Sequence, residues 1–243
     1  MSGAGSKHGG SSYGGVPIGD FVLVCASMLE RSFDREGLVH VIGVGKTAAA
    51  MQLPTVLRNK PLARAVLLFG VAGAFPDRHR STPAPARLGG LCVVASDSFG
   101  DEGVETPTGF QAIEPGPTSL YTSAHGGEAG GKILGGLRSF PANPRMAQQV
   151  ASLLDVPLVR GVTVSTCSGT EATSERMAAR SGADIETMEG AAVAYVCRQL
   201  EVPLLHVRAI SNWTGDRGRG EWDLGGAVTA IGQAVRRLCA ASA

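Results

Sequence analysis

The sequence lacks an excess of charge of either sign. Its 22 lysine and arginine residues are balanced by 21 aspartate and glutamate residues, which leaves a net charge of +1 at pH 7. Nucleic acids and anionic membrane surfaces attract proteins that carry clustered positive charge. The near-neutral balance therefore argues against nucleic acid and membrane as partners.

Long apolar runs and paired cysteines are also missing. The chain has no apolar stretch of about 18 residues, and its first residues lack the charged-then-apolar order of a signal peptide. The five cysteines form no CxxC pair, and the five histidines show no metal-ligand spacing. These absences predict a cytoplasmic protein without a metal site.

The sequence does contain apolar segments of strand and helix type in alternation. With 243 residues, 44% of them hydrophobic, the chain can bury one substantial core. Residues 1–19 are rich in glycine and serine and are predicted to be a disordered tail, followed by one domain over residues 20–243. Predicted strands at residues 21–26, 39–44, 65–69, 91–95, 159–165 and 204–210 alternate with predicted helices. This alternation predicts an α/β fold with a central mixed sheet flanked by helices.

The segment GVGKT, which ends in Gly45-Lys46-Thr47, is not a phosphate-binding P-loop. The first glycine of that motif would have to stand at position 40, which is His40. A three-glycine dinucleotide fingerprint fails as well, because no glycine follows Gly45 until Gly70. The sequence therefore gives no sign of a nucleotide cofactor.

Residues 184–212 carry the most informative pattern in the chain. An acidic turn leads into a helix of small and apolar residues and then into an apolar strand. Glu189 stands where the helix begins, and Ser211 and Asn212 stand where the strand ends. Ligands of open α/β sheets bind outside the carboxyl ends of the strands. These residues are therefore candidate site residues, and the alternative for each is a solvated turn.

The runs TMEGAAVAYVC and VPLLHVRAISN resemble the signature half of the purine nucleoside hydrolase and phosphorylase superfamily. Within it, the sequence is most similar to the methylthioadenosine nucleosidases and the futalosine hydrolases. The resemblance implies an enzyme that cleaves a small-molecule nucleoside without a metal or cofactor. It also implies a homodimer or a larger homo-oligomer.

The resemblance assigns roles to several residues. Glu30 follows the first predicted strand, where the nucleosidases carry a glutamate that activates water; its alternative role is in the first turn of a helix. Glu189, preceded by Met188 as in the family's Met-Glu pair, would accept hydrogen bonds from the ribose hydroxyls and stabilise the developing cation. Gly73 would lie beside the ribose.

Asn212 departs from the pattern of the methylthioadenosine nucleosidases, which carry aspartate at this position. An amide cannot protonate N7 of the departing purine. It can donate to a 6-oxo group and accept from a protonated N7, because it presents one donor group and one acceptor group. The departure therefore predicts a 6-oxopurine nucleoside as substrate.

A second segment supports the same substrate class. The run GVETPTGF, around residues 103–110, resembles the futalosine hydrolases, and hypoxanthine, a 6-oxopurine, is the base of futalosine. From its chemistry alone this segment is a polar loop that covers a pocket or contacts a neighbouring subunit. The resemblance implies hydrolysis of futalosine to hypoxanthine and dehypoxanthinyl futalosine, a step in menaquinone biosynthesis.

Three features of the predicted site stay open from the sequence. Arg208 either orients neighbouring carboxylates or forms a structural ion pair. Arg217 either binds a carboxylate of the substrate or belongs to a solvated loop. The relatives hold the purine near residues 166–173 partly with an aromatic residue, and this chain has none there.

Three other functions remain as alternatives. The first is an adenine-releasing nucleosidase acting on methylthioadenosine, S-adenosylhomocysteine or aminofutalosine, against which Asn212 argues. The second is a phosphorylase, which would need an anion site near residues 70–73 and would not need Glu30. The third is a nucleoside-binding protein that keeps the fold without catalysis.

Overall fold

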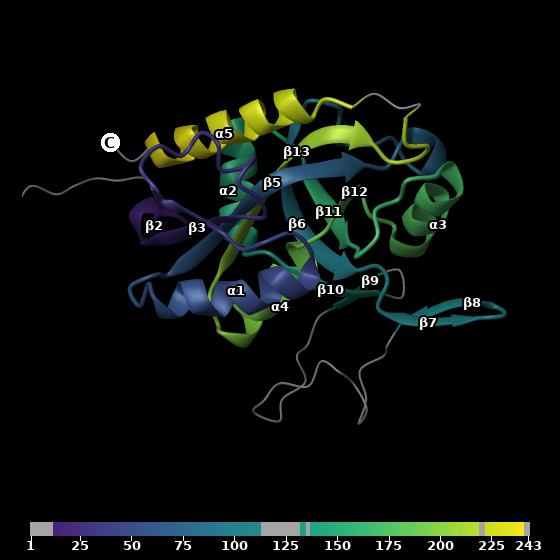
Figure 1. The fold of residues 1–243 in the computed structure, drawn as a ribbon, viewed down its shortest axis with the longest axis horizontal. Coiled ribbons are helices and arrows are strands. Elements are labelled where there is room, and N and C mark those ends of the chain that lie inside the picture. The colour runs from purple at the N-terminus through teal and green to yellow at the C-terminus, as the bar shows by residue number, and fades with distance from the viewer. Residues whose placement is uncertain (1–11, 113–131, 135–136, 219–221, 241–243) are drawn as a thin grey trace, which may run out of the picture.

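A computed structural model describes residues 12–112, 132–134, 137–218 and 222–240 (Figure 1). The strands are β1 (Ser12–Tyr13), β2 (Val16–Pro17), β3 (Phe21–Cys25), β4 (Val39–Val41), β5 (Ala65–Ala74), β6 (Leu91–Phe99), β7 (Gly103–Thr106), β8 (Gly109–Ala112), β9 (Lys132–Leu134), β10 (Leu137–Pro141), β11 (Leu158–Thr163), β12 (Ile185–Thr187) and β13 (Leu204–Trp213). The helices are α1 (Lys46–Arg58), α2 (Pro144–Leu154), α3 (Glu171–Ser181), α4 (Gly190–Gln199) and α5 (Leu224–Ala240). Within these ranges no helix is long and apolar enough to cross a membrane.

The main sheet is mixed, as the sequence predicts. β3 pairs in parallel with β4 and β5, and β13 runs parallel to β5. β12 and β10 are antiparallel to their neighbours β5 and β6. β13 also pairs with β6, while β12 and β11 connect β5 to β6 by the other route, so these strands close a circuit. The closure brings the ends of β5, β12 and β13 close together.

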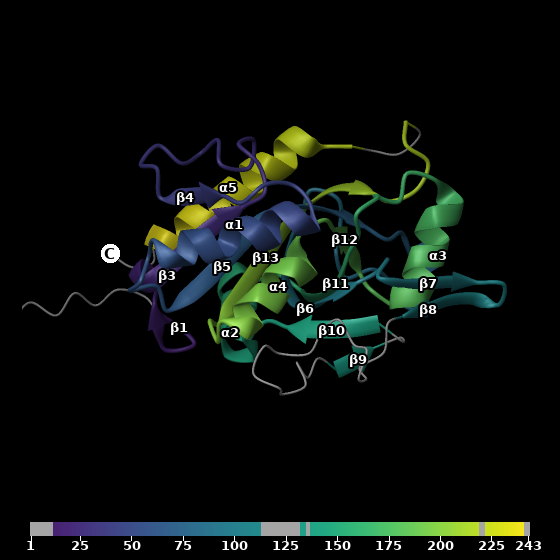
Figure 2. The same cartoon turned by 60° about the horizontal axis from the view of Figure 1, so that its bottom comes forward.

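Helices cover both faces of the sheet (Figures 1 and 2). α1 and α4 pack on one face, and α2 and α5 pack on the other. The alternation of side chains along β3 sets this division: Val22 and Val24 join the core under α1 and α4, whereas Leu23 joins the opposite core. The predicted arrangement of three layers is confirmed.

The predicted disordered tail over residues 1–19 was wrong for residues 12–19, and residues 1–11 lie outside the described part. β1 and β2 form a small antiparallel hairpin. Tyr13 at its centre is buried, and its hydroxyl donates to the carbonyl of Leu238 at 3.0 Å. The glycines that suggested a tail form the turn instead, since Gly14 and Gly15 adopt φ values of 59° and 85°.

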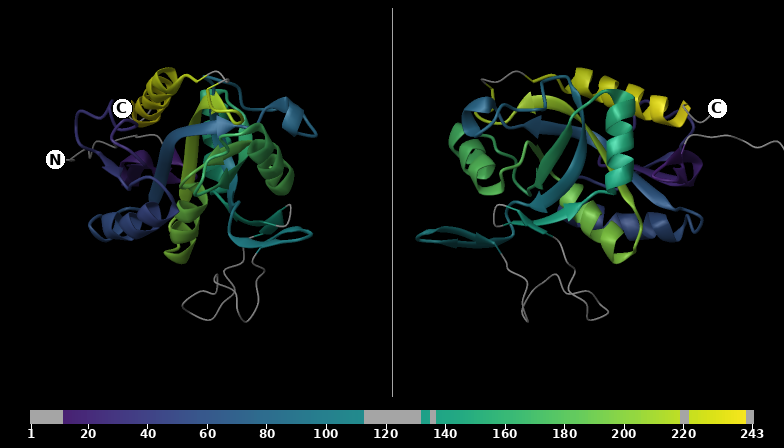
Figure 3. Two further views of the ribbon diagram at one scale, coloured as in Figure 1. Left: turned by 45° about the vertical axis from the view of Figure 1, so that its right-hand side comes forward. Right: turned by 180° about the vertical axis from the view of Figure 1, so that it is seen from behind.

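The segment predicted as a polar loop at residues 103–110 is an antiparallel hairpin, β7–β8, which extends from the body of the protein (Figures 2 and 3). The ring of Phe110 packs under the guanidinium of Arg180, whose Cζ atom is 3.9 Å from the ring centroid. The residues of this hairpin are not among those that line the main cavity. Its resemblance to futalosine hydrolases therefore does not reflect a contact with the cavity within this chain.

Candidate active site

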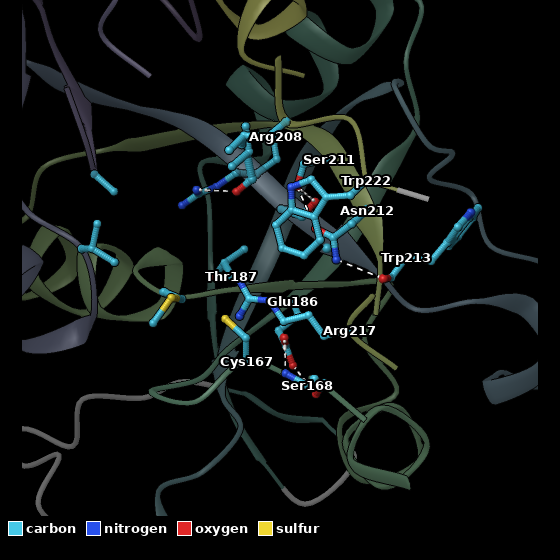
Figure 4. A pocket seen from close by; sticks show the side chains of 18 of the residues that line it. Cys167, Ser168, Glu186, Thr187, Arg208, Ser211, Asn212, Trp213, Arg217 and Trp222 are labelled. Atoms are coloured by element: carbon cyan, nitrogen blue, oxygen red, sulfur yellow. Dashed lines mark hydrogen bonds between the residues drawn. The ribbon is translucent and has the colours of Figure 1, made fainter. Parts of the chain in front are cut away.

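One cavity of about 630 Å³ lies at the carboxyl ends of β3, β5 and β13 and beside β12. Every residue predicted for the site lines it: Glu30, Gly73, Met188, Glu189, Arg208, Ser211, Asn212 and Arg217. These residues come from five separate stretches of the chain, and the closed circuit of strands brings them together (Figure 4). The predicted site residues therefore share one cavity.

Glu30 is held by backbone N–H groups where β3 ends. Its Oε2 atom accepts from the amides of Ala26 and Ser27 at 3.0 and 2.9 Å, and its Oε1 atom accepts from the amide of Val71 at 3.0 Å. A Cβ atom at Gly70 would lie 2.3 Å from Oε1, so a glycine is needed there. The carboxylate is buried and fixed in orientation, with one edge toward the cavity.

Glu189 is anchored at both carboxylate oxygens. Oε1 accepts from the amide of Gly45 at 3.0 Å, and Oε2 accepts from Nη2 of Arg208 at 3.3 Å. Gly45 belongs to the GVGKT segment, which is not a P-loop. Its backbone amide instead donates to the carboxylate of Glu189.

Arg208 is almost completely buried and ties several parts of the site together. Besides Glu189, it donates from Nη1 to the carbonyl of Val71 at 3.0 Å and from Nε to Nε2 of His206 at 2.7 Å. Burial and the neighbouring guanidinium hold the pKa of His206 well below its usual value, so the imidazole is neutral and can accept this bond. Arg208 thus forms an ion pair with Glu189, and this contact restricts the orientation of the carboxylate.

Asn212 presents one donor and one acceptor toward the cavity. Its Oδ1 accepts from the hydroxyl of Ser211 at 2.8 Å, and its Nδ2 donates to the carbonyl of Trp213 at 3.0 Å. An amide oxygen can accept a second hydrogen bond and an amide nitrogen carries a second N–H. Ser211 therefore fixes the orientation of the amide. One acceptor site on Oδ1 and one N–H on Nδ2 stay available for a ligand.

Sequence reasoning missed the aromatic side chains of the cavity. Trp213 and Trp222 both line it, and Trp222 forms an isolated β-bridge with Asn212. The guanidinium of Arg217 lies near the Trp222 ring, with Cζ 5.2 Å from the centroid (Figure 4). The aromatic residues therefore lie at the end of β13 and in the loop that follows it, and not near residues 166–173. The two tryptophans of the chain, which flank the Gly-rich loop there, were the signal.

Two buried carboxylates were also missed. Glu186 lines the cavity and accepts from the amide and hydroxyl of Ser168 at 2.8 and 2.5 Å. Asp97 lies beneath the start of α4, where it accepts from the hydroxyls of Thr163 and Thr187 at 2.8 and 3.2 Å. Burial raises the pKa of Asp97 to about 7 and also raises the pKa of Glu186. Asp97 lies in the polar second half of β6, and Glu186 lies in β12, a strand of three residues, so neither residue stands directly after an apolar run.

Groups suited to bind a metal do not occur in the described residues, since no cluster of three or more His, Cys, Asp or Glu side chains forms there. The site is instead built from carboxylates, an amide, one buried arginine and aromatic rings. This set of groups suits hydrogen bonding to a polar ligand that has a flat ring.

Comparison with known proteins identifies the class to which this fold and site belong. Residues 34–242 match the model of the phosphorylase superfamily. A futalosine hydrolase of Thermus thermophilus is 32% identical over 86% of this chain and 84% of its own length. A futalosine hydrolase of Streptomyces coelicolor is 30% identical over 71% of this chain and 64% of its own length.

Solved structures show the same fold. A methylthioadenosine/S-adenosylhomocysteine nucleosidase of Colwellia psychrerythraea in complex with adenine has a TM-score of 0.67 at 17% identity, covering 91% of this chain and 94% of that one. A futalosine hydrolase of Helicobacter pylori has a TM-score of 0.65 at 15% identity, covering 91% and 97%. The chain belongs to the phosphorylase superfamily and, within it, to the family of the futalosine hydrolases. The predicted fold, family and enzyme class, a nucleoside hydrolase, are confirmed.

Proposed function

We propose that the enzyme hydrolyses the N-glycosidic bond of futalosine and releases hypoxanthine and dehypoxanthinyl futalosine, a step in menaquinone biosynthesis. The observation that carries the choice of base is the amide of Asn212, which keeps one donor and one acceptor available in the cavity. The donor suits O6 of hypoxanthine, and the acceptor suits a protonated N7. The sequence relatives named futalosine hydrolase support the same substrate.

Glu30 is our candidate for the general base. A carboxylate within hydrogen-bond reach of a water molecule can orient it and take its proton as it attacks the sugar. The backbone donors on Glu30 fix the carboxylate without neutralising it, because amides carry no net charge. Gly73, beside Val71 and Ala72 in the same wall, leaves room for the ribose.

Water, rather than phosphate, is the nucleophile that this geometry supports. The backbone amides at the ends of β3 and in β5 would be the natural donors for a phosphate, and the carboxylate of Glu30 already occupies them. A phosphate brought there would meet a negative charge in a buried position. This arrangement argues against the phosphorylase alternative.

Glu189 is our candidate for binding the ribose hydroxyls, with Met188 beside it in the cavity wall. Breaking the glycosidic bond creates positive charge on the sugar, which a fixed carboxylate stabilises. Arg208 and Gly45 each anchor one oxygen of Glu189, so the carboxylate does not have to reorganise during the reaction. Trp213 and Trp222 supply the aromatic surface for the base.

Arg217 is our candidate for the end of the substrate that carries a carboxylate. It lies in the cavity wall on the loop after β13, and its guanidinium can form paired hydrogen bonds with a carboxylate. Its backbone amide donates to the carbonyl of Gly169 at 3.0 Å, which fixes the loop in place. With the substrate carboxylate bound to Arg217, the sugar would contact Glu189 and the base would contact Asn212.

We also propose that the enzyme works in the cytoplasm as a homodimer or larger homo-oligomer. Leu29 and Val44 line the cavity and are nevertheless 51% and 58% exposed. Apolar side chains exposed at the rim of a cavity often belong to an interface. All five cysteines are free thiols, which suits a reducing compartment. Light scattering coupled to gel filtration gives the oligomeric state.

Replacing Asn212 with Asp tests whether the amide selects a 6-oxopurine by donating a hydrogen bond to O6. We expect the ratio of kcat/KM for futalosine over aminofutalosine to fall by about 10- to 100-fold, because a carboxylate cannot donate to O6. Asn143→Asp is the matched control: Asn143 caps α2 outside the cavity, and aspartate caps helices equally well. An unchanged ratio in Asn212→Asp would refute the role of the amide.

A further inference from the structure

Glu186 is a buried carboxylate in the cavity wall to which the proposed mechanism gives no role. It belongs to β12, is 5% exposed, and its two carboxylate oxygens each accept a hydrogen bond from Ser168. A carboxylate oxygen can accept more than one hydrogen bond, so both oxygens keep capacity for a ligand. Ser168 fixes the orientation of the carboxylate and brings no positive charge to it.

The register of the sheet places Glu186 in one row with Asn212. Gly73 of β5 pairs with Asn212 of β13 on one side and with Glu186 of β12 on the other. Residues paired across neighbouring strands point to the same face of a sheet. Asn212 and Glu186 therefore border the same part of the cavity, on either side of the Gly73 backbone.

Gly73 leaves this space open because it has no side chain. Two strand spacings separate the flanking backbones by about 9 to 10 Å. A Cβ atom at Gly73 would lie 3.0 Å from Cγ2 of Thr214 and 3.2 Å from Nδ2 of Asn212, so the amide of Asn212 lies close to the glycine. Figure 4 shows Asn212 and Glu186 in the same cavity, with Ser168 next to Glu186. Both side chains line the cavity of about 630 Å³, a volume within the usual range for a small-molecule site.

The two groups match neighbouring positions on a 6-oxopurine. In this base the ring nitrogen N1, next to the 6-oxo carbon, carries a hydrogen, whereas in a 6-aminopurine the same nitrogen carries a lone pair. We propose that Glu186 accepts a hydrogen bond from N1–H of the base and that it disfavours 6-aminopurines, whose N1 lone pair would face the carboxylate. This inference rests on the proposed function, and it adds a second specificity-determining residue to Asn212.

The competing explanation for Glu186 is purely structural, since it anchors the loop that contains Ser168. A structural anchor would affect the binding of all bases alike. A base-reading carboxylate affects the choice between bases, and this difference separates the two explanations. The buried position strengthens the effect, because a hydrogen bond to a charged acceptor away from water discriminates more strongly against a mismatched ligand.

The experiment compares kcat/KM for futalosine and for its 6-amino counterpart in the wild type, Glu186→Gln and Ser168→Ala. We expect Glu186→Gln to lower kcat/KM for futalosine by about 10- to 100-fold, because a charged acceptor is lost. The value for the 6-amino substrate should stay the same or rise, since the new amide can donate to N1. Ser168→Ala should shift the ratio less and in the same direction. The matched control is Glu175→Gln, because Glu175 is exposed on α3 and does not line the cavity.

Calorimetric binding of hypoxanthine and adenine to the same proteins gives a readout that does not depend on turnover. Loss of the preference for hypoxanthine in Glu186→Gln would support the proposal. Equal changes for both bases, or no change, would overturn it while leaving futalosine hydrolysis intact. If the wild type releases no hypoxanthine from futalosine, the proposed function fails, and binding of the two free bases still decides the role of Glu186.

Discussion

Replacing Glu30 with Gln is expected to lower kcat for futalosine hydrolysis by about 10²- to 10⁴-fold, the usual contribution of a positioned general base. The amide keeps the size of the carboxylate but cannot take a proton from water. It also places an NH₂ group against backbone donors, because both oxygens of Glu30 now accept from amides. The measurement is the steady-state rate of hypoxanthine release.

A loss of activity in Glu30→Gln is informative only if the variant is folded and still binds hypoxanthine. The dissociation constant for hypoxanthine should remain close to that of the wild type, because Asn212 and Glu186 are unchanged. The temperature of unfolding should fall, because the new NH₂ group faces a backbone donor, but the variant should be folded at the assay temperature. Glu36→Gln, an exposed position outside the cavity, serves as the matched control and should keep full activity. A folded Glu30→Gln enzyme with nearly normal kcat would show that another group activates the water.

Replacing Gly190 with Ala is expected to lower the free energy of unfolding by about 3 kcal/mol, at the upper end of the usual cost of overpacking. A Cβ atom there would lie 2.0 Å from Oδ2 of Asp97 and 2.7 Å from Cε1 of His206. Neither neighbour can yield easily, since both are buried and Asp97 is held by two threonine hydroxyls. Urea denaturation of the wild type and the variant gives the difference.

A second glycine in a helix provides the control for this prediction. Gly225 lies in α5, and a Cβ atom added there would meet nothing within 4 Å. Gly225→Ala should therefore raise the free energy of unfolding by up to about 1 kcal/mol through helix propensity. Similar stabilities for the two variants would contradict the close packing of Asp97 and His206 around Gly190.

Much of the fold and of the site could be predicted because several polar site residues stand at or just after the ends of apolar strands. Glu30 follows the apolar β3, and Asn212 lies near the end of β13, so the polar residue after each hydrophobic run marked the cavity. The start of a helix is harder to predict: α2 begins at Pro144, because Asn143 caps it. Caps depend on side-chain geometry that hydrophobic periodicity does not encode.

The features that escaped prediction depend on contacts between distant segments. The pairing of Gly45 with Glu189 joins positions far apart in the chain, and only the folded sheet brings Trp222 beside Asn212. Glu186 belongs to a strand too short to show a periodic pattern. The N-terminal hairpin was missed because glycine suits a tight turn as well as a flexible tail, and only the burial of Tyr13 separates the two.

The most direct test of this account is chromatographic identification of the base released from futalosine, aminofutalosine, inosine and methylthioadenosine, each with and without phosphate. The account predicts hypoxanthine from futalosine at a rate that does not change with phosphate, and little adenine from the 6-amino substrates. Adenine as the main product would contradict the roles given to Asn212 and Glu186. A rate that requires phosphate would contradict the role given to Glu30.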